Sequence, residues 1–529
     1  MKSSKVFLAV MAIGFSLGLA SCKKSKPISE NPPPPVVEPT QQTGTRGQLT
    51  ADSIFLYAKD LYYWRSDLPD YATFNPRQYT DNDKELYALS QISINPSTAQ
   101  PYELGPDAGY PKYSYIDYGI DGGKKSALKA DLSGNADDYG FSAIFNTQTD
   151  LRVKYVYPNS PAAKAGLTRG CRITSVNGQG DVSYTKDNLI FLNKALFGDN
   201  ASVDLKFTDL AGANKTVTVT RATYTENPIL YTHVFTVGTK KVGYFVFNSF
   251  TNNASAQINA AFADFASKGV TEMVVDLRYN GGGFVSTAAQ IINLLGPTAQ
   301  NGNTMFTYYY SQYLQNLTAA QKKKSILIRQ PNLDNQRNLQ LSDGYLNGKY
   351  ATLADINYSP TFADNIEKFQ TASSHNFSRV YFLVTGSTAS ASELTINSLK
   401  PVIDVKLIGS TTYGKPVGFF PVHIDKFDLY IPEFETKNQQ NVGGYYAGLN
   451  VDKETSEDPT KNWGDSTETL LGYALQYAKA GNFTLPPAKS GSLKQQSVKL
   501  AAKLSPQELR AVSASLDQNA FQGMVRDRK

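Results

Sequence analysis

The pattern of apolar and polar positions divides the chain into a helical beginning, a β-rich middle and a second half in which strands and helices alternate. In residues 51–64, apolar side chains recur at helical spacing after Asp52, which we interpret as the helix cap. Residues 83–92 predict a further helix. Residues 137–224 contain short strand-like runs separated by turns, with one helical segment at 185–197, and predict a small β-rich module.

From residue 225 onward the pattern changes to longer apolar runs, most of them followed by a segment of helical periodicity. This alternation predicts an α/β core, interrupted by a long irregular insertion at about 300–375. The helix expected after the insertion ends before Pro401, which cannot continue it. Strands are predicted at 241–250, 271–280 and 379–386, and helices at 254–269, 285–296 and 390–400.

Length and composition indicate a globular protein of several domains. The 529 residues exceed what one hydrophobic core usually absorbs, and 41% of them are hydrophobic and 19% charged. The net charge is +6, but basic and acidic residues are interspersed, and no basic block is interleaved with aromatic residues. We therefore expect no nucleic-acid partner.

The N-terminus carries an export signal. Residues 1–21 combine a basic start with an apolar run too short for a stable membrane-spanning helix. The run ends in LASC, which resembles a bacterial lipobox, where the cysteine, here Cys22, is diacylated. Lys23 follows, and no Asp indicates retention in the inner membrane, so we expect an outer-membrane lipoprotein that faces the periplasm. The alternative is an ordinary secretory peptide with an incidental cysteine.

The cysteines and histidines predict neither a disulfide nor a metal site. Of the two cysteines, Cys22 is assigned to the lipid, which leaves Cys171 without an intrachain partner. The three histidines are far apart in the sequence, and no Cys/His spacing typical of a metal site occurs. We expect no metal and no cofactor.

The stretch GSTASASELTINSLK, residues 386–400, places several serines where a buried strand gives way to a helix. Backbone N–H groups at a helix start are unpaired and stabilise an anion, so a serine at this junction can act as a nucleophile beside oxyanion donors. The same residues also fit a different interpretation. Ser390 and Glu393 form the S-x-x-E pattern of a capping box, which needs no catalysis.

A lysine downstream is the candidate general base. Burial disfavours the ammonium form, and a lysine whose pKa falls to about 7–8 can accept a proton at neutral pH. Lys415 follows a Gly-containing turn, and its neighbours Tyr413, Val417, Phe419 and Phe420 suit an apolar pocket. The alternative is an ordinary surface lysine after a turn.

The segments TASASE and IGSTTYGKPVG resemble the nucleophile and lysine segments of peptidase family S41, the C-terminal (tail-specific) processing peptidases. The resemblance implies that Ser390 attacks the substrate and that Lys415 is its base, with the family's spacing between them. The segment MVVDLRYNGGG is similar to the family's glycine-rich stretch. By that likeness the oxyanion donors are the N–H of Ala391 and one from Gly281 or Gly282.

This resemblance covers roughly residues 137–450 and implies a crotonase/ClpP-like α/β protease core, which we place at 225–485. Residues 51–136 resemble, more weakly, the helical leader of Bacteroidetes-type members. The sequence departs from the family at Phe419, where some members have a Gln that orients the lysine. His423 is a candidate neighbour of the amine, and no third catalytic residue is assigned.

The β-rich module resembles a PDZ domain. Its run PNSPAAKAGLTRGCRITSVNG matches the common PDZ pattern, with Cys171 in place of the usual Asp. Tyr139, Gly140 and Phe141 stand where such domains bind a C-terminal carboxylate, while the captured chain adds to the sheet as a strand. The resemblance implies that polypeptide tails are the partners. The alternative is a spacer that only gates the active site.

Two further functions are compatible with parts of the sequence. Penicillin-binding proteins and β-lactamases use S-x-x-K, Y-x-N and K-S-G motifs, and matches occur at residues 126–129, 345–347 and 489–491. These matches are short, and the last lies in a polar tail rather than an apolar strand. The other alternative is a non-catalytic binding lipoprotein with an inert protease-like core.

The sequence therefore predicts a multidomain α/β protein that acts as a serine endopeptidase with a Ser-Lys dyad on exported polypeptides. The expected division is a lipoprotein signal peptide (1–21), a Pro-rich tether (22–50), a helical N-terminal domain (51–136), a PDZ-like domain (137–224), the protease core (225–485) and a polar C-terminal tail (486–529).

Overall fold

The computed structural model describes residues 43–105, 109–118, 134–334, 338–371, 377–485 and 523–526. All of them lie within the unit formed by residues 42–529. Helices and strands are interleaved along it, and the prediction of a multidomain α/β protein is confirmed. The predicted signal peptide, the lipidation site Cys22 and most of the polar tail lie outside the described residues.

The α/β part is built on a six-stranded sheet of order β11-β12-β13-β17-β18-β23. β11 and β12 are antiparallel, and the remaining neighbours are parallel. The strands predicted at 241–250, 271–280 and 379–386 are β12, β13 and β17. The bounds are β11 Ile229–Val237, β12 Lys240–Phe247, β13 Glu272–Asp276, β17 Arg379–Val384, β18 Asp404–Gly409 and β23 Lys453–Glu454.

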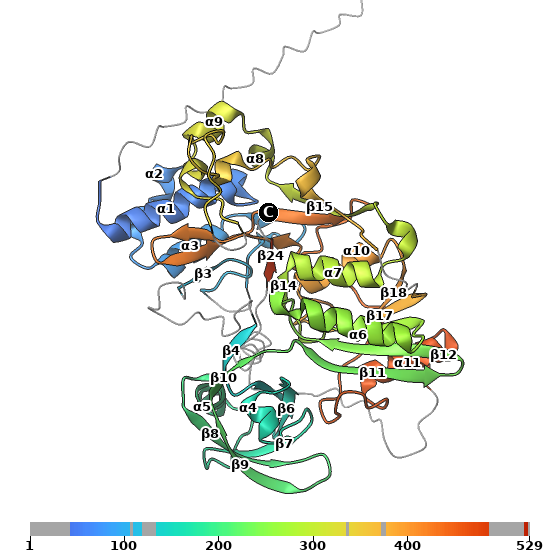
Figure 1. Ribbon diagram of the computed structural model, residues 1–529. Helices are drawn as coiled ribbons and strands as arrows, with labels where there is room; N and C mark the ends of the chain where they lie inside the picture. Colours follow the sequence, from blue (N-terminus) through green and yellow to red (C-terminus); the bar gives the residue numbers. More distant parts are fainter. Residues whose placement is uncertain are drawn as a thin grey trace, which may run out of the picture. The chain divides into compact units, whose positions relative to one another are not determined.

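The two faces of this sheet bury different side chains, because successive residues of a strand point to opposite sides. In β12, Phe245 and Phe247 pack in the large core with α6 and α7, whereas Tyr244 and Val246 pack with α11. Figure 1 shows α6 and α7 running side by side along the sheet. The helices are α6 Ser255–Ser267, α7 Val285–Leu295, α10 Ala391–Leu399 and α11 Thr469–Ala480, the first three as predicted.

The β-rich module encloses its own hydrophobic cluster, to which Leu189 and Leu192 of its helix contribute. Its five-stranded antiparallel sheet has the order β5-β6-β7-β8-β9, so β5 is an outer strand. The helix predicted at 185–197 is α5, Lys186–Phe197. The other bounds are β4 Asn135–Asp138, β5 Phe141–Thr147, β6 Asp150–Val156, α4 Pro161–Lys164, β7 Arg172–Val176, β8 Ser202–Thr208, β9 Asn214–Thr220 and β10 Ala222–Thr225, the last paired with β4.

The first helix, α1 (Arg46–Leu61), begins before the predicted position and takes residues 46–50 from the expected tether. Its N-cap is Thr45, and the prediction of Asp52 as the cap is wrong. Asp52 is buried inside the helix, where its carboxylate forms a salt bridge of 2.7 Å with Arg77. The prediction failed because an Asp that precedes an apolar run can form a buried ion pair as well as a helix cap. The neighbouring elements are η1 Arg65–Asp67, α2 Tyr71–Phe74, η2 Pro76–Gln78, α3 Asn82–Ser90, β1 Ile94–Asn95, β2 Gln100–Pro101 and β3 Tyr115–Asp117.

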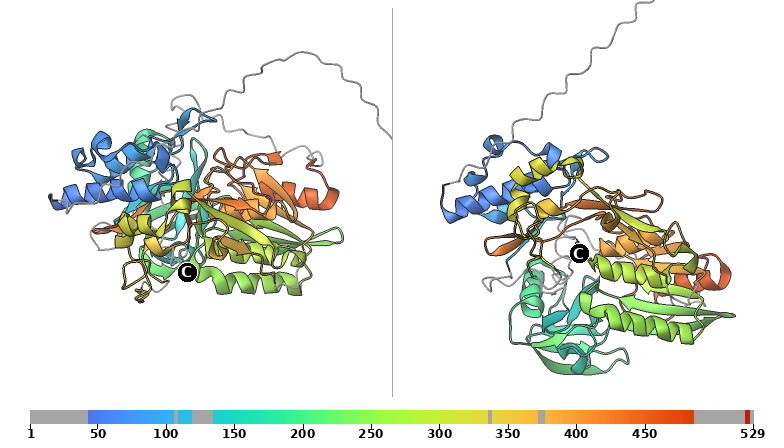
Figure 2. Two further views of the ribbon diagram at one scale, coloured as in Figure 1. Left: turned by 90° about the horizontal axis from the view of Figure 1, so that it is seen from above. Right: turned by 45° about the horizontal axis from the view of Figure 1, so that its top comes forward.

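The insertion expected to be irregular opens with a regular strand, β15 (Thr304–Tyr310), which pairs with β16 and β22. Helix α8 and the 3-10 turn η6 then contact α1, and Figure 2 shows these yellow segments beside the blue N-terminal helices in both views. The insertion therefore joins the N-terminal helices to the core. The bounds are α8 Gln312–Asn316, α9 Ala319–Lys324, η4 Asn252–Ala254, η5 Thr298–Gln300, η6 Ile326–Arg329, η7 Leu353–Asp355, η8 Ala363–Asn365, β16 Ile366–Lys368, β19 Val417–Gly418, β20 Val422–Ile424, β21 Phe427–Tyr430 and β22 Phe434–Asn438.

The end of the chain also contributes a strand. β24 (Gly523–Val525) lies in the segment predicted to be a polar tail and pairs in parallel with β14 (Gly282–Phe284). β14 contains the glycines that follow β13, and Figure 1 shows β24 beside it. The tail thus reaches the part of the fold that carries the candidate oxyanion glycines.

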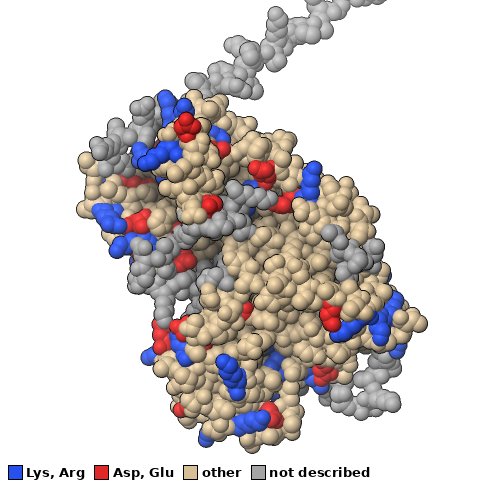
Figure 3. Space-filling model, in the orientation of Figure 1, with Lys and Arg blue, Asp and Glu red and all other residues tan. Residues whose placement is uncertain are grey.

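Charges of both signs are interspersed on the surface that Figure 3 draws. Several are paired, as Lys268 and Asp264 are at 2.7 Å and Lys406 and Asp404 at 2.7 Å. In the part of the chain that the structure describes, no helix has the length and apolar character needed to cross a membrane.

Candidate active site

Ser390 occupies a sharp turn between β17 and α10. Its side chain is fully buried, and its backbone has φ 61° and ψ −110°, which L residues rarely adopt. Such a conformation costs about 1–3 kcal/mol and is concentrated at active sites, including strand-to-helix turns that carry a nucleophile. Among the described residues, Ser390 Oγ has no hydrogen-bond partner. The backbone conformation therefore adds support for a nucleophile that the sequence alone did not contain.

Glu393 ties the serine segment to the lysine segment. One of its oxygens, Oε2, accepts the backbone N–H of Ser390 at 2.9 Å and that of Lys415 at 2.8 Å. Its other oxygen, Oε1, accepts Gly414 N–H at 2.8 Å and the Thr412 hydroxyl at 2.5 Å. Glu393 thus makes the glutamate half of the predicted capping box and also holds the lysine loop, while Ser390 Oγ is not engaged by the helix. The capping and catalytic interpretations are compatible.

Lys415 lies in the loop between β18 and β19 and has no solvent exposure. Burial lowers the pKa of its amine to about 7, because water no longer stabilises the ammonium form. The Nζ atom donates to Tyr113 O at 3.4 Å and lies 4.3 Å from the ring centroid of Phe419. The alternative of an exposed surface lysine is therefore wrong, and a large fraction of the amine is neutral at pH 7.

The pocket around this amine contains the expected aromatic wall, and His423, a candidate neighbour that was also open to an exposed position, has a half-exposed side chain. Val417, Phe419 and Phe420 are buried, as predicted for the walls. Phe419, which replaces the family's Gln, presents its ring to the amine. The Nδ1 atom of His423 lies 3.1 Å from an oxygen of Asp428, a partner on the next strand.

Glu103 and residues 112–114 complete the pocket, although their sequence gave no functional signal. The Tyr113 hydroxyl and the Lys112 amine donate to Gly414 O at 2.7 and 3.3 Å, and so brace the loop that carries Lys415. Burial lowers the pKa of Lys112 to about 8. The buried carboxylate of Glu103 accepts Ser114 N–H at 2.7 Å and raises the pKa of Lys415, an effect smaller than that of burial.

Two of the candidate oxyanion residues, Gly282 and Ala391, lie close to Ser390. A Cβ atom on Gly282, whose φ is 113°, would meet both Ala391 N and Ser390 Cβ at 3.0 Å, so the close approach requires glycine. Asn280 fixes this approach: its backbone oxygen accepts Ala389 N–H at 3.1 Å, and its Oδ1 accepts Gly282 N–H at 2.9 Å. Because the Gly282 amide is already engaged, Gly281 is the better glycine donor beside Ala391.

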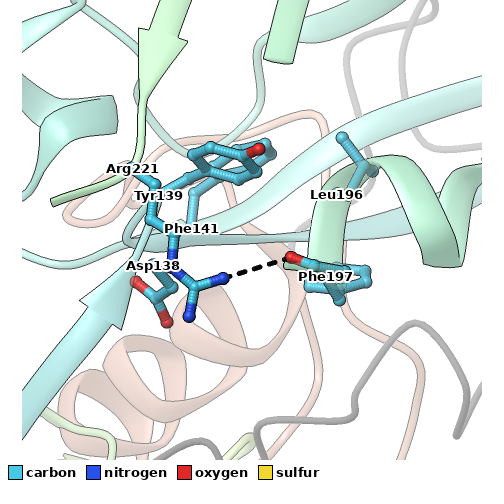
Figure 4. A pocket seen from close by; sticks show the side chains of 7 residues that line it. Asp138, Tyr139, Phe141, Leu196, Phe197 and Arg221 are labelled. Carbon is cyan, nitrogen blue, oxygen red and sulfur yellow. Dashed lines mark hydrogen bonds between the residues drawn. The ribbon is translucent and has the colours of Figure 1, made fainter. Parts of the chain in front are cut away.

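The predicted carboxylate loop of the β-rich module lines a pocket with one cationic side chain. Figure 4 shows Tyr139 and Phe141 on one side, Leu196 and Phe197 of α5 on the other, and the guanidinium of Arg221 beside the carboxylate of Asp138. Arg221 is held by Asp137 and Asp199, each at 3.2 Å. Apolar rings beside a guanidinium suit a peptide end that carries an apolar side chain and a carboxylate.

Gly140 shapes this loop but does not offer a free amide. Its φ is 79°, and a Cβ there would meet Ser160 Cβ at 2.0 Å, so only glycine fits. Its N–H donates to Asp138 Oδ1 at 2.7 Å. A ligand carboxylate would therefore have to displace Asp138 or use the other groups of the pocket.

A buried cluster links the β-rich module to the glycine-rich segment of the core. Arg169 of the module has no exposed side chain and bonds Tyr279 Oη at 2.6 Å and Glu457 at 2.7 Å. Arg278, next to Tyr279, bonds Glu468 through both of its terminal nitrogens at 3.0 Å. Arg278 and Tyr279 immediately precede Asn280 and the candidate oxyanion glycines in sequence. No sequence pattern indicated that the β-rich module contacts this segment.

The rival motifs gain no structural support. Residues 126–129 and 489–491 lie outside the described residues. Asn347 of the third match accepts the N–H groups of Lys349 and Tyr350 at 2.9 and 3.0 Å, as expected in a turn. This match is explained by local backbone bonding.

The site combines a hydroxyl at a strained turn, a buried amine whose pKa is lowered to about 7 and a helix start next to glycine backbone. Such an arrangement suits acyl transfer, in which an amine activates a hydroxyl and N–H groups stabilise an oxyanion.

Comparisons with known proteins support this chemistry at the level of domains. Residues 241–443 match the model of peptidase family S41, and residues 152–204 match that of a PDZ domain. The chain thus carries a PDZ domain followed by a peptidase S41 domain. The PDZ match contains α4, β7 and α5 with most of β6, and the S41 match contains Ser390 and Lys415.

The chain is similar to a carboxyl-terminal-processing protease of Picosynechococcus, at 28% identity over 32% of this chain and 40% of that protein. It is also similar to a chloroplastic C-terminal processing peptidase of Tetradesmus obliquus, at 24% identity over 32% of this chain and 39% of that protein. The matches thus span about 40% of the length of these relatives. A crystal structure of a protein from Bacteroides fragilis, assigned as an S41 protease, shares the fold with a TM-score of 0.52, 24% identity and coverage of 83% of this chain and 98% of that one.

Proposed function

We propose that this chain, with its PDZ and peptidase S41 domains, is a serine endopeptidase that cleaves unfolded polypeptides through Ser390 and Lys415. The observation that carries the proposal is the shared carboxylate oxygen: Ser390 N–H and Lys415 N–H both donate to Glu393 Oε2, which fixes the backbones of the two residues against each other while both side chains are fully buried. The relatives named as processing proteases support the same reaction class.

In the first half of the reaction, Ser390 Oγ attacks the substrate carbonyl carbon and transfers its proton to the neutral Nζ of Lys415. The oxygen that becomes negative is stabilised by the N–H of Ala391 and that of Gly281. Lys415 then gives its proton to the departing amine, which leaves an acyl-serine. The hydroxyl and the amine must meet for this step, and catalytic hydrogen bonds often tighten only when substrate is bound.

In the second half, a water molecule attacks the acyl-serine while Lys415 takes its proton, and Ser390 leaves with the proton returned. Every proton transfer uses the same amine, so the reaction needs no histidine and no carboxylic acid at the reacting atoms. The direct experiment is incubation of the purified protein with an unstructured polypeptide and detection of fragments by mass spectrometry. The proposal expects internal cleavage, and a complete lack of fragments over a range of such substrates would favour a peptide-binding lipoprotein with an inert core.

Replacing Glu393 by glutamine is expected to lower both stability and reactivity. The carboxylate now accepts four hydrogen bonds, two at each oxygen. In the glutamine variant the NH₂ group would take the place of one oxygen and could not accept the two bonds made there. We expect the free energy of unfolding to fall by about 2–4 kcal/mol, and displacement of the dyad to lower Ser390 reactivity by about 10²-fold.

Denaturant unfolding and the rate of Ser390 labelling by a fluorophosphonate measure these two effects. The control is Glu454→Gln, an exposed glutamate of β23, which should change neither. Equal stability and labelling in Glu393→Gln and wild type would show that Glu393 does not position the dyad.

We propose that the PDZ domain captures the C-terminal tails of substrates in the pocket of Figure 4. Arg221→Gln should then weaken binding of a peptide with a free carboxylate by at least about tenfold, since charge-assisted bonds are worth about 1.5–3 kcal/mol. Fluorescence anisotropy with the peptide and its C-terminal amide measures this effect. Arg172→Gln, a half-exposed arginine of β7, is the control. If the acid and the amide bind equally well, the carboxylate is not the recognised group.

We also propose that the protein is attached through lipid on Cys22 to the outer membrane and faces the periplasm. The support is the apolar run that ends in LASC, the Lys23 that follows it and the Pro-rich stretch between this cysteine and α1. Unfolded exported polypeptides are abundant in that compartment, which agrees with a tail-dependent peptidase.

A further inference from the structure

The C-terminal strand β24 fills a groove between the glycine-rich strand and the loop after Lys415. On one side, Gly523 N–H donates to Gly281 O at 3.1 Å. On the other side, Phe419 N–H donates to Met524 O at 3.0 Å, and Arg526 N–H donates to Phe419 O at 3.1 Å. A short segment of the chain's own tail is thus bonded on both edges, in the manner of a peptide added to a sheet.

The side chains of this segment are also packed against the core. Met524 is fully buried in the main core, with Sδ 4.0 Å from Thr436 Oγ1. Val525 is buried against Phe419. The guanidinium of Arg526 lies 3.9 Å from the ring centroid of Tyr308. A long, unbranched apolar side chain therefore fits a pocket beneath the groove.

The groove leads to the reacting atoms. The position of a Cβ on Gly282 would be 2.3 Å from Gly523 O, 3.0 Å from Ala391 N and 3.0 Å from Ser390 Cβ. A backbone carbonyl of the tail, the nucleophilic residue and the expected oxyanion donor therefore surround one point. With the tail in this position, no described residue makes a hydrogen bond to Ser390 Oγ.

We propose that the groove between β14 and β19 is the substrate-strand site of this peptidase, and that β24 is a built-in occupant that competes with substrate. The inference rests on the proposed function, because it assigns the substrate path to Ser390. The site takes an extended polypeptide and selects a Met-like side chain in the pocket now filled by Met524. Because β24 is part of the same chain, its effective concentration at the site is high, and a substrate must displace it. The apparent affinity for substrate is therefore reduced in proportion to the fraction of time that the site is open.

The test compares Met524→Glu with the matched control Met524→Leu in the full chain. A carboxylate is costly in this buried hydrophobic position, whereas leucine keeps the size and apolar character of methionine. We expect Met524→Glu to speed cleavage of an unstructured polypeptide and fluorophosphonate labelling of Ser390 by at least about tenfold. The increase reflects the small fraction of wild-type molecules in which β24 has left the site. Met524→Leu should stay within about twofold to threefold of wild type, as volume-conserving swaps do.

Hydrogen exchange of the Phe419 amide, which donates to Met524 O, reports on tail occupancy without any activity. In wild type this amide should exchange slowly, and in Met524→Glu faster. A synthetic peptide of residues 520–529, added to a chain that ends at residue 522, should slow the exchange of this amide and the labelling again. The same peptide with Glu for Met524 should not.

The outcomes separate the two ideas. Unchanged exchange in Met524→Glu, or loss of the native circular dichroism in both Met524→Glu and the shortened chain, would overturn the inference and make β24 a structural strand. Suppose that exchange is faster in Met524→Glu, but the variant neither cleaves nor labels. The proposal that β24 is a displaceable occupant would then stand, and the proposed peptidase activity would be wrong.

Discussion

Replacement of Ser390 by alanine is expected to abolish cleavage, with kcat/KM for an unstructured polypeptide lowered by at least about 10³-fold. The serine hydroxyl is the only atom that the proposed reaction joins covalently to the substrate, so no neighbouring group replaces it. The fold should remain, because Oγ makes no hydrogen bond to any described residue and its loss leaves no polar atom unpaired.

The control for this variant lies in the same stretch. Ser387 is three positions before the turn and only half-buried, so Ser387→Ala should cleave at the wild-type rate. Fragment release measured by mass spectrometry or by an internally quenched peptide distinguishes the two. Cleavage by Ser390→Ala within about tenfold of wild type would show that the nucleophile lies elsewhere.

Replacement of Lys415 by methionine is expected to remove activity and to stabilise the protein. Burial holds the pKa of the amine at about 7 instead of 10.5, which disfavours the folded state wherever the unfolded chain binds the extra proton. An apolar side chain of similar length avoids this, so the free energy of unfolding at pH 7 should rise by on the order of 2–4 kcal/mol. Cleavage should fall by at least about 10³-fold, as for loss of a dyad member.

The pH dependence of this stability difference follows from the same pKa values. The folded-state pKa lies below the unfolded one, so the unfolded chain binds more protons between about pH 7 and 10.5. The advantage of Lys415→Met should therefore be complete below about pH 7 and disappear as pH rises toward 10.5. Denaturant unfolding at several pH values checks this, and Lys415→Arg, whose cation cannot lose its proton, should be inactive without the gain in stability. An active Lys415→Met would remove the lysine from the mechanism.

The central α/β architecture was predictable because it depends on local apolar patterns. The centres of its predicted strands, residues 242–247, 273–275 and 380–384, contain only apolar residues and glycine, as parallel strands covered on both faces require. The helices α6, α7 and α10 were predictable because their apolar residues recur with helical periodicity, which is also a local pattern. By contrast, Asp52 gave a wrong helix start, since its true partner, Arg77, lies 25 positions away in sequence.

The candidate site was predictable in its residues but not in its construction. Sequence pattern placed Ser390 at a strand-to-helix junction and Lys415 among apolar neighbours, and both are buried. It gave no indication of the positive φ at Ser390. Backbone strain of this kind is imposed by distant contacts such as those of Asn280 and Glu393.

Two segments with no recognisable pattern also reach the site. Tyr113 contacts Lys415 through its backbone oxygen, which every residue possesses, so no side-chain pattern marks it. Residues 523–525 form a strand too short for any periodicity, and it pairs with β14, which lies more than 200 positions earlier in the sequence. Contacts of this kind depend on the whole fold, and a single sequence cannot reveal them.

The most direct test of a neutral-lysine mechanism is the pH dependence of Ser390 labelling by a small fluorophosphonate, because the reagent needs no peptide recognition. Lys415 accepts the serine proton only when it is uncharged, so the labelling rate of wild type should rise with pH through a midpoint near 7 and then level off. In Lys415→Met the rate should be low and should lack that midpoint. A wild-type rate that does not change between pH 5 and 9, or a Lys415→Met profile identical to that of wild type, would contradict the account.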